Sequence, residues 1–387
     1  MGHKGIYGVA LAGLAASMLM PAPAMAQQDR VSGTEKGSLL MFSKFEVRWD
    51  EFGACVQDTF ITMSNDHPND VKVQFYVVNG DPAIPGHPGW NNFDIETTLT
   101  GNQPFWWALG RTEGPGAFQP VITLDPPYGR PADDGTGDTY IRGFVYGWCV
   151  DDLENREIKH NHLSGSATLV NYRDMHAWEY NAWAFQRLTE EPGDGVLNMD
   201  GLEYANSYSQ LLINFQAAGS DAYSYGPYLV VSDTDVTLHP ISVDFRQETA
   251  GPRITKAHYD VWNENEVKLS GAYRCVWCWD QTFLSDYGIP NHFDVIHLQT
   301  SHGKARIDGL ASQLCPGSTE EAILGVVARY LYFGAGNSMY GAVSGTNMIG
   351  MGLEGGVIEY DSLDPPPEAP VNPFRAVDSL LQGLLKK

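Results

Sequence analysis

The sequence predicts an all-β protein: two antiparallel β-sandwich-like domains followed by a short C-terminal amphipathic helix. Its clearest segments, such as 45–49 and 71–77, alternate apolar with polar residues, which is the period of a strand with one buried face. The chain also contains 41 glycines and 23 prolines spread along its length, a composition that favours strands joined by turns. The sequence has no regular alternation of strands with helices and no repeat period, so we expect antiparallel sandwiches.

The first 26 residues have the pattern of a secretory signal peptide. Lys4 supplies the positive charge, residues 6–20 form an apolar stretch, and Ala24-Met25-Ala26 provides a small-x-small cleavage pattern. The apolar stretch is shorter than the roughly 20 residues of a membrane-spanning helix, and prolines follow it directly. We therefore expect export to the periplasm or the cell exterior, with Gln27 as the first mature residue and no transmembrane segment.

Three strands are expected near the N-terminus, over 45–49, 59–63 and 71–77, with a long polar turn over 65–70 between the last two. Segments rich in β-branched and aromatic residues predict further strands over 140–150, 167–171, 211–215, 228–231, 236–245, 267–279 and 294–300. A helix-capping pattern occurs at 318–321, although the segment 326–333 that follows reads equally well as a strand.

Roughly 360 residues remain after the signal peptide, more than one hydrophobic core usually holds, so two domains are expected. A polar stretch near 250 separates two strand-rich regions, which places a first domain over 27–250 and a second over 251–362. Residues 363–387 form a separate piece, in which a proline-rich linker precedes a helix with one apolar face. That helix is expected to dock on its own domain, to mediate self-association or to anchor the protein at a surface.

The chain is strongly acidic. It has 24 Lys and Arg residues against 47 Asp and Glu residues, a formal net charge of -23. Such a surface repels phosphate backbones and anionic lipids, so nucleic-acid binding and electrostatic membrane docking are not expected. Cations and neutral partners, including a polysaccharide or a protein surface, remain compatible with this charge.

Five cysteines in an exported chain predict disulfide bonds. Pairing within the expected domains joins Cys55 to Cys149, and Cys315 to either Cys275 or Cys278, which leaves one thiol over. Cys275 and Cys278 are three residues apart in a predicted strand, so their side chains point to opposite faces. This spacing favours a structural disulfide over a zinc or redox site formed by the pair.

Histidines suggest a transition-metal site. On a strand, His160 and His162 would share one face, and His176 with Glu179 follows within the length of a hairpin. The pair resembles the first half of a cupin motif, but Ser164-Gly165 stands where that motif has a carboxylate, and no second half follows. The alternative is a pair of polar loop histidines.

Calcium is the cofactor expected at two acidic segments, because carboxylate oxygens are the hard ligands that Ca²⁺ prefers. Asp133, Asp134 and Asp138 lie in one predicted loop, and Asp233 with Asp235 in another. Neither segment has EF-hand spacing, so ordinary solvated loops are the alternative interpretation.

No sequence motif indicates a known catalytic apparatus: G-x-S-x-G, H-E-x-x-H, the P-loop and a helix-opening G-x-G-x-x-G are all missing. The acidic cluster Asp151, Asp152, Glu154 and Glu157 supplies carboxylates for a glycosidase pair, or simply a solvated turn at the end of a strand.

Ten tryptophans favour a binding role, since exposed aromatic rings stack on sugars. The rings that we expect to serve as binding aromatics are Trp106, Trp107, Trp178 and Trp183, with Trp277 and Trp279 as a further pair. Packing in the core is the alternative for each of them.

Several segments resemble a family of exported bacterial β-rich proteins. They are Lys36-Gly37-Ser38-Leu39-Leu40, Arg48-Trp49-Asp50, Gln57-Asp58-Thr59-Phe60, Asn79-Gly80-Asp81-Pro82, Glu179-Tyr180-Asn181-Ala182-Trp183 and Lys304-Ala305-Arg306-Ile307-Asp308-Gly309. The resemblance spans most of the mature chain. It implies no activity and no catalytic residue.

The sequence thus favours a secreted or periplasmic, non-enzymatic sandwich protein with a structural, adhesive or binding role toward a surface, a polysaccharide or a protein. One alternative is an extracytoplasmic hydrolase that uses a carboxylate pair or a histidine-bound metal. Another is a subunit of an extracellular assembly.

Overall fold

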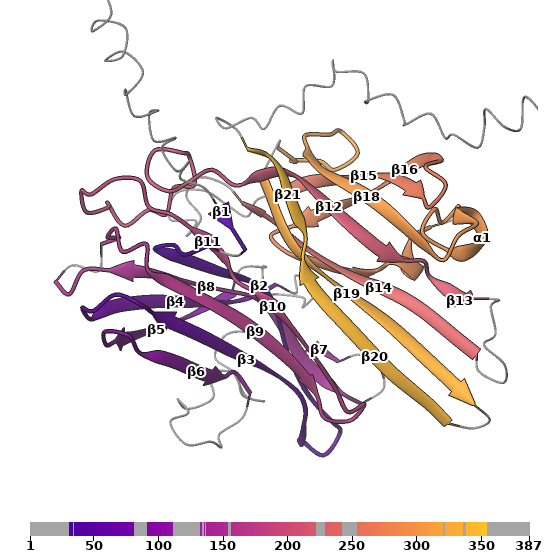
Figure 1. The fold of residues 1–387 in the computed structure, drawn as a ribbon, viewed down its shortest axis with the longest axis horizontal. Helices are drawn as coiled ribbons and strands as arrows, with labels where there is room; N and C mark the ends of the chain where they lie inside the picture. The colour runs from indigo at the N-terminus through magenta and orange to yellow at the C-terminus, as the bar shows by residue number, and fades with distance from the viewer. Residues whose placement is uncertain are drawn as a thin grey trace, which may run out of the picture.

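The computed structural model describes residues 31–353 except 34, 81–90, 111–131, 134, 136, 154–155, 222–228, 242–253, 289, 320–321 and 336–337. The described part is nearly all strand, arranged in antiparallel sheets, which confirms the predicted all-β fold (Figure 1). The predicted signal peptide and the predicted piece over 363–387 lie outside the described residues. No helix in the described part is long and apolar enough to cross a membrane.

The first half of the chain forms an 11-stranded sheet. Its strands are β1 (Val31–Ser32), β2 (Leu39–Trp49), β3 (Cys55–Asn65), β4 (Val71–Asn79), β5 (Asn91–Leu99), β6 (Pro104–Ala108), β7 (Ala132–Asp133), β8 (Thr139–Val150), β9 (Leu163–Asn171), β10 (His176–Asn181) and β11 (Trp183–Phe185). Strand β3 pairs with β2 only at their joined ends, and along the rest of its length with β6 and β9. The sheet therefore folds over itself into a sandwich.

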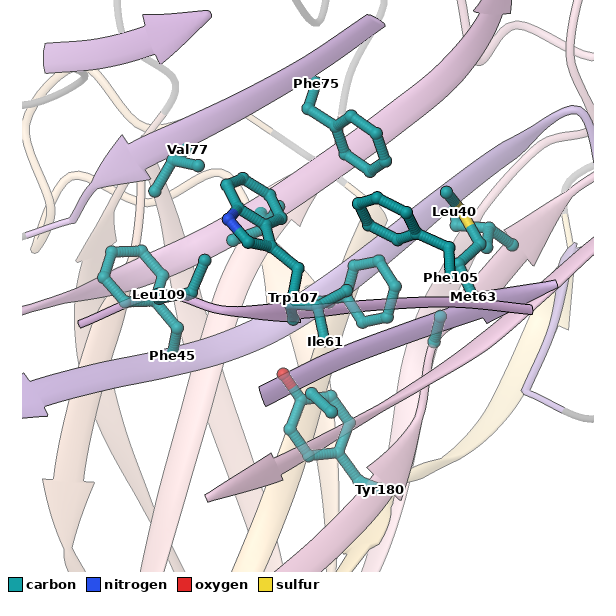
Figure 2. Close-up of a cluster of buried hydrophobic side chains, with 14 of the residues drawn as sticks. Leu40, Phe45, Ile61, Met63, Phe75, Val77, Phe105, Trp107, Leu109 and Tyr180 are labelled. Atoms are coloured by element: carbon teal, nitrogen blue, oxygen red, sulfur yellow. The ribbon is translucent and has the colours of Figure 1, made fainter. Parts of the chain in front are cut away.

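Alternation along these strands places the apolar rows inside the first sandwich. Phe45 and Val47 of β2 face a common core with Ile61 of β3, Phe75 of β4 and Trp107 of β6 (Figure 2). Because β4 and β6 are not neighbours in the sheet, the contact of Phe75 with Trp107, 5.7 Å between ring centroids, holds the two layers together.

The second half of the chain forms two 5-stranded sheets that share another core. One consists of β16 (Lys268–Trp277), β15 (Ile254–Asn263), β18 (His302–Leu310), β12 (Tyr208–Gln216) and β21 (Ile349–Leu353), in that order. The other consists of β13 (Gly219–Asp221), β14 (Leu229–Ile241), β19 (Ala322–Ala335) and β20 (Ser338–Asn347), with β17 (Asp280–Phe283) also paired to β14. We call these two sheets together the second sandwich.

The change from one sandwich to the other lies between Phe185 of β11 and Tyr208 of β12. Strands β12 and β14 precede residue 250, yet they pair with β18 and β19, which come late in the chain. The boundary that we placed at 250 therefore does not coincide with the change of sheet, because strand pairing here joins segments far apart in sequence.

Residues 322–335 form the strand β19, which is the strand alternative left open for 326–333 and agrees with their β-branched and aromatic content. One local expectation changes in the structure. The expected strand over 294–300 contains instead the short helix α1 (Val295–Leu298), where the Asp294 carboxylate accepts a hydrogen bond from the His297 backbone N–H at 2.7 Å. A 3-10 turn, η1 (Leu284–Asp286), precedes it.

The two sandwiches meet along a buried junction. Its apolar cluster includes Leu39 and Trp148 from the first sandwich and Leu324 and Trp279 from the second. A side chain at Gly345 of β20 would overlap the ring of Trp178 of β10, so the two sandwiches approach closely there. In Figure 1, β10 lies next to β20.

Polar side chains also cross the junction. Lys44 of β2 forms a buried ion pair with Asp235 of β14. Ser43 accepts a hydrogen bond from the Trp279 indole N–H at 2.9 Å through its carbonyl oxygen, and its hydroxyl lies 2.9 Å from Nε2 of His239.

The structure contains a disulfide between Cys275 and Cys315, which settles the alternative left open for Cys315 in favour of Cys275 rather than Cys278. The expected bridge between Cys55 and Cys149 is not formed. Cys55 pairs with Trp49 at one end of β2. Cys149 follows Trp148, which pairs with Leu39 at the other end of β2. A strand of that length keeps them about 30 Å apart, far beyond disulfide reach.

Candidate functional site

A cavity of about 370 Å³ opens where the two sandwiches meet. The first sandwich contributes residues of β2, β3, β8, β9 and β10, and the second contributes residues of β17 and β19. Its lining consists of Glu46, Arg48, Val56, Gln57, Asp138, Arg142, Leu169, Asn171, Arg173, Asp174, His176, Trp178, Gln281, Phe283, Tyr330 and Tyr332. We call it the junction cavity. Its volume lies within the range of small-molecule sites.

Paired charges form one side of the junction cavity. The guanidinium of Arg173 donates two hydrogen bonds to the Asp138 carboxylate, at 2.6 and 2.9 Å, in a bidentate arrangement. Arg48 donates to Glu46 through Nη2 at 2.9 Å, and its Nη1 lies 3.8 Å from Asp138. These side chains are therefore held in fixed positions by one another.

Glu46 is an ionised group in a buried position. Burial favours its neutral form, but the positive charges of Lys44, Arg48 and Arg142, with the hydrogen bond from Arg48, hold its pKa below the usual value. The Glu46 carboxylate therefore stays charged at neutral pH and acts as a hydrogen-bond acceptor.

The charge network continues into the second sandwich. Gln281 of β17 donates to Asp235 at 2.7 Å, while its side-chain oxygen accepts a hydrogen bond from Arg142 at 3.3 Å. The Arg142 guanidinium also lies over the ring of Trp279, 5.7 Å from its centroid. Groups that line the cavity are thus connected directly to the Lys44–Asp235 pair that crosses the junction.

Aromatic rings of β19 also line the cavity. Tyr330 and Tyr332 stack with their centroids 6.3 Å apart and their planes 11° from parallel. Phe283 and His176 contact Tyr330 at centroid distances of 5.6 and 6.1 Å. Burial lowers the pKa of His176, so its imidazole is neutral at neutral pH and adds no charge to the cavity.

The predicted metal residues separate into two places. His160 and His162 directly precede β9, not on a strand, whereas His176 pairs with Asn171 at the far end of β9. The nine residues of β9 put about 30 Å between them. Glu179 lies on β10 and accepts a hydrogen bond from Ser166.

His67, which we did not predict, lies beside His160 and His162 instead. Burial and the neighbouring imidazoles of His67 and His162 lower the pKa of His160 to about 4. In the described part of the chain, no three His, Cys, Asp or Glu side chains have converged as the ligands of a metal ion do.

Among the predicted calcium residues that the structure describes, Asp138, Asp233 and Asp235 do not gather in acidic loops. Asp138 is bound by Arg173, and Asp233 and Asp235 lie within the strand β14, where Asp235 is paired with Lys44. The only structure described for Asp133 is its backbone in β7, and Asp134 lies outside the described residues. The segment 233–235 was mistaken for a loop because its polar residues bond to protein groups, Asp233 to Ser285, Thr234 to Gln216 and Asp235 to Lys44.

Most of the predicted binding aromatics are core residues. Trp107, Trp178 and Trp183 are buried, as is Trp279, while Trp106 is 37% exposed and Trp277 50% exposed. Of these, only Trp178 borders the junction cavity. The acidic cluster after Cys149 lies at the end of β8 away from the cavity, about 25 Å from Arg142 along the strand. Glu154 of that cluster is outside the described residues.

Sequence reasoning missed the junction cavity because alternation assigned Glu46 and Arg48 to a solvent-facing row. The available signal was the segment 43–46, where Ser43, Lys44 and Glu46 occur in a strongly apolar strand. Both faces of β2 are buried in the structure, and its charged residues therefore face other charged residues.

Comparisons with known proteins do not assign the chain to a family. No family model matches it, and no curated protein matches it. A glycosyl hydrolase family 2 member from Bacteroides cellulosilyticus aligns at 8% identity and a TM-score of 0.13, over 82% of this chain and 30% of its own. A putative beta-galactosidase from Bacteroides fragilis aligns at 6% identity and a TM-score of 0.11, over 79% of this chain and 32% of its own. The chain thus spans about a third of these proteins.

Proposed function

We propose that this protein is an exported, non-enzymatic binding protein that holds a segment of a neutral polysaccharide in the junction cavity. The observation that carries this proposal is the pairing of a fixed polar side with an aromatic side in one cavity. Export follows from the predicted signal peptide.

The polar side suits hydroxyl groups, each of which donates and accepts a hydrogen bond. The cavity offers guanidinium donors beside carboxylate acceptors, and the amides of Gln57 and Asn171 provide both. Three arginines are balanced by three carboxylates among the lining residues, so the cavity favours a ligand without net charge. Because these groups already hold one another in place, little side-chain ordering is needed on binding.

The aromatic side suits the apolar face of a sugar ring. Tyr332 is half-buried at the edge of the cavity, stacked on Tyr330, and it presents an aromatic surface beside the polar groups. A polysaccharide segment would place its hydroxyls toward Arg48 and Asn171 and its ring faces toward the tyrosines.

The charge state of Glu46 supports binding rather than hydrolysis. A glycosidase needs a carboxylic acid whose pKa is raised so that it protonates the leaving oxygen. The neighbouring cations hold the pKa of Glu46 low, and Asp138 is engaged on both oxygens by Arg173.

Affinity electrophoresis in gels that contain xyloglucan, glucomannan or a soluble β-1,3-glucan tests the proposal, with alginate as the charged comparison. We expect retardation by at least one neutral polymer, and about tenfold weaker binding for Tyr332→Ala, from losing about 1.4 kcal/mol of stacking. Tyr273→Ala is the matched control, since this tyrosine is exposed on β16 and is not among the cavity residues. Absence of retardation by all three neutral polymers, or equal loss in both variants, would refute the proposal.

A further inference from the structure

Three histidines from two segments meet at one end of the first sandwich. His67 lies in the turn between β3 and β4, and His160 and His162 lie just before β9. The ring centroids are 5.0 Å apart for His67 and His160, 4.6 Å for His67 and His162, and 5.4 Å for His160 and His162. All three side chains are half-buried, so an ion from solvent reaches them.

A buried asparagine holds this cluster together. The side-chain oxygen of Asn65 accepts a hydrogen bond from the His67 backbone N–H at 3.0 Å and lies 2.9 Å from Nε2 of His160. Its amide nitrogen donates to the Asn69 carbonyl at 2.9 Å, which fixes the turn that carries His67. The backbone of His160 is fixed as well, since its N–H donates to the Ser38 hydroxyl at 2.7 Å.

The hydrogen-bond partners determine which nitrogen of each ring carries a lone pair. Nε2 of His160 donates to the Asn65 oxygen, and Nδ1 of His162 donates to the Asp66 carboxylate at 3.0 Å, so the lone pairs lie on Nδ1 and Nε2 respectively. Nδ1 of His67 accepts a hydrogen bond from the Asn69 backbone N–H at 3.1 Å, so its lone pair becomes available to a metal ion only when the ring turns away from that bond. Metal-bound histidines characteristically donate their other N–H to a carboxylate or carbonyl, as His160 and His162 do here.

We propose that His67, His160 and His162 together bind one divalent transition-metal ion, for which Zn²⁺ is the probe. Three imidazoles on a tetrahedral zinc, with bonds of about 2.0–2.1 Å, have ring centroids about 5 Å apart, which matches the spacing in this cluster. The three rings do not converge on one point as they lie, so metal binding requires rotation of the rings about their Cβ–Cγ bonds. Imidazole ligands select zinc, copper or nickel over calcium.

Isothermal titration of the untagged, EDTA-treated full-length protein with zinc chloride near neutral pH tests the site. We expect one ion per chain with a Kd below about 100 µM, and at least tenfold weaker binding for each of His67→Ala, His160→Ala and His162→Gln. Asp66→Asn should also weaken binding about tenfold or more, because it removes the partner of His162 outside the ligand set. Calcium chloride should give no binding heat.

The double variant His292→Ala/His297→Ala is the matched control, because these imidazoles also lie near each other, at 6.4 Å between centroids, and no third imidazole joins them among the described residues. Its zinc affinity should equal that of the parent. Thermal unfolding checks that each variant is folded, and a Cu²⁺ titration followed by electron paramagnetic resonance reports the number of bound nitrogens in the parent itself. No zinc binding in the parent, unchanged binding in the His67 variant, or loss in the control would overturn the proposal.

Discussion

Acidification should destabilise the junction between the sandwiches through His239. This side chain is fully buried, its ring is stacked on Phe144 with centroids 5.1 Å apart, and Nε2 lies 2.9 Å from the Ser43 hydroxyl. Its Nδ1 is buried without a hydrogen-bond partner, so an N–H formed there by protonation would have no acceptor. Burial accordingly lowers the pKa of His239 to about 3.

The direction of the pH effect on stability depends on whether the folded or the unfolded state binds more protons. In the unfolded chain the imidazole has its ordinary pKa of 6.5, so between pH 6.5 and about 3 the unfolded state binds more protons than the folded state. The free energy of unfolding therefore falls as the pH falls through this window. At about pH 5 the loss from this one residue is about 2 kcal/mol, from roughly 1.4 kcal/mol per pH unit.

Urea unfolding at about pH 7.5 and about pH 5 measures this loss in the parent and in His239→Gln, whose amide still donates to Ser43 but does not titrate. Other histidines add to the total pH dependence, so the quantity of interest is the difference between the two proteins. We expect the variant to lose about 2 kcal/mol less than the parent on acidification. His302→Gln, at an exposed position on β18, controls for removal of an imidazole. An equal loss in parent and His239→Gln would refute the reasoning.

Lys44→Met should lower the free energy of unfolding by about 3–5 kcal/mol, because it leaves the buried Asp235 without its cationic partner. In urea unfolding, the double variant Lys44→Met/Asp235→Leu should be more stable than the single variant. The reverse order of stability would contradict this account. Replacing both Cys275 and Cys315 by serine should cost about 4 kcal/mol, from the loop between residues separated by 40 positions. Thiol titration of the unreduced, denatured parent should then find three thiols, and one thiol would indicate a second bridge. Trp107→Ala should lower the free energy of unfolding by about 3–5 kcal/mol, because it leaves a cavity in the core of the first sandwich. Trp106→Ala should lower it clearly less, because the Trp106 ring is partly exposed. Similar losses in the two variants would mean that the two rings are buried alike.

Local patterns predicted the strands well, because alternation depends only on which side of one strand faces a core. The turn over 65–70, the strand over 71–77 and the strand within 140–150 all occur in the structure. Pairing between strands was not predictable in the same way. Nothing within residues 208–241 indicates that β12 and β14 pair with β18 and β19. Likewise, the sequence does not show that Cys55 and Cys149 lie near opposite ends of β2.

The candidate site was the least predictable part, because it collects residues from seven strands of two sandwiches. Its key charged residues, Glu46 and Arg142, lie in the strands β2 and β8, which are buried on both faces. The alternation of apolar and polar residues, which distinguishes a buried face from an exposed one, therefore did not reveal them. For the histidine cluster, the pair at 160 and 162 was visible in the sequence, but its third member, His67, is contributed by a turn almost a hundred residues earlier.

The contacts across the junction also constrain the order in which the chain folds. Ser43 and Lys44 meet partners that follow them by 196 and 191 residues. During synthesis the N-terminal part of the chain is made first, so the strands of the first sandwich are complete before β14 has been made. During that interval Lys44 has no counterion from β14, and Leu39 and Trp148 lack the side chains of Ile241, Trp279 and Leu324 that cover them in the native state. The incomplete chain therefore exposes apolar surface that is prone to aggregation, and this exposure lasts until the second sandwich has been made.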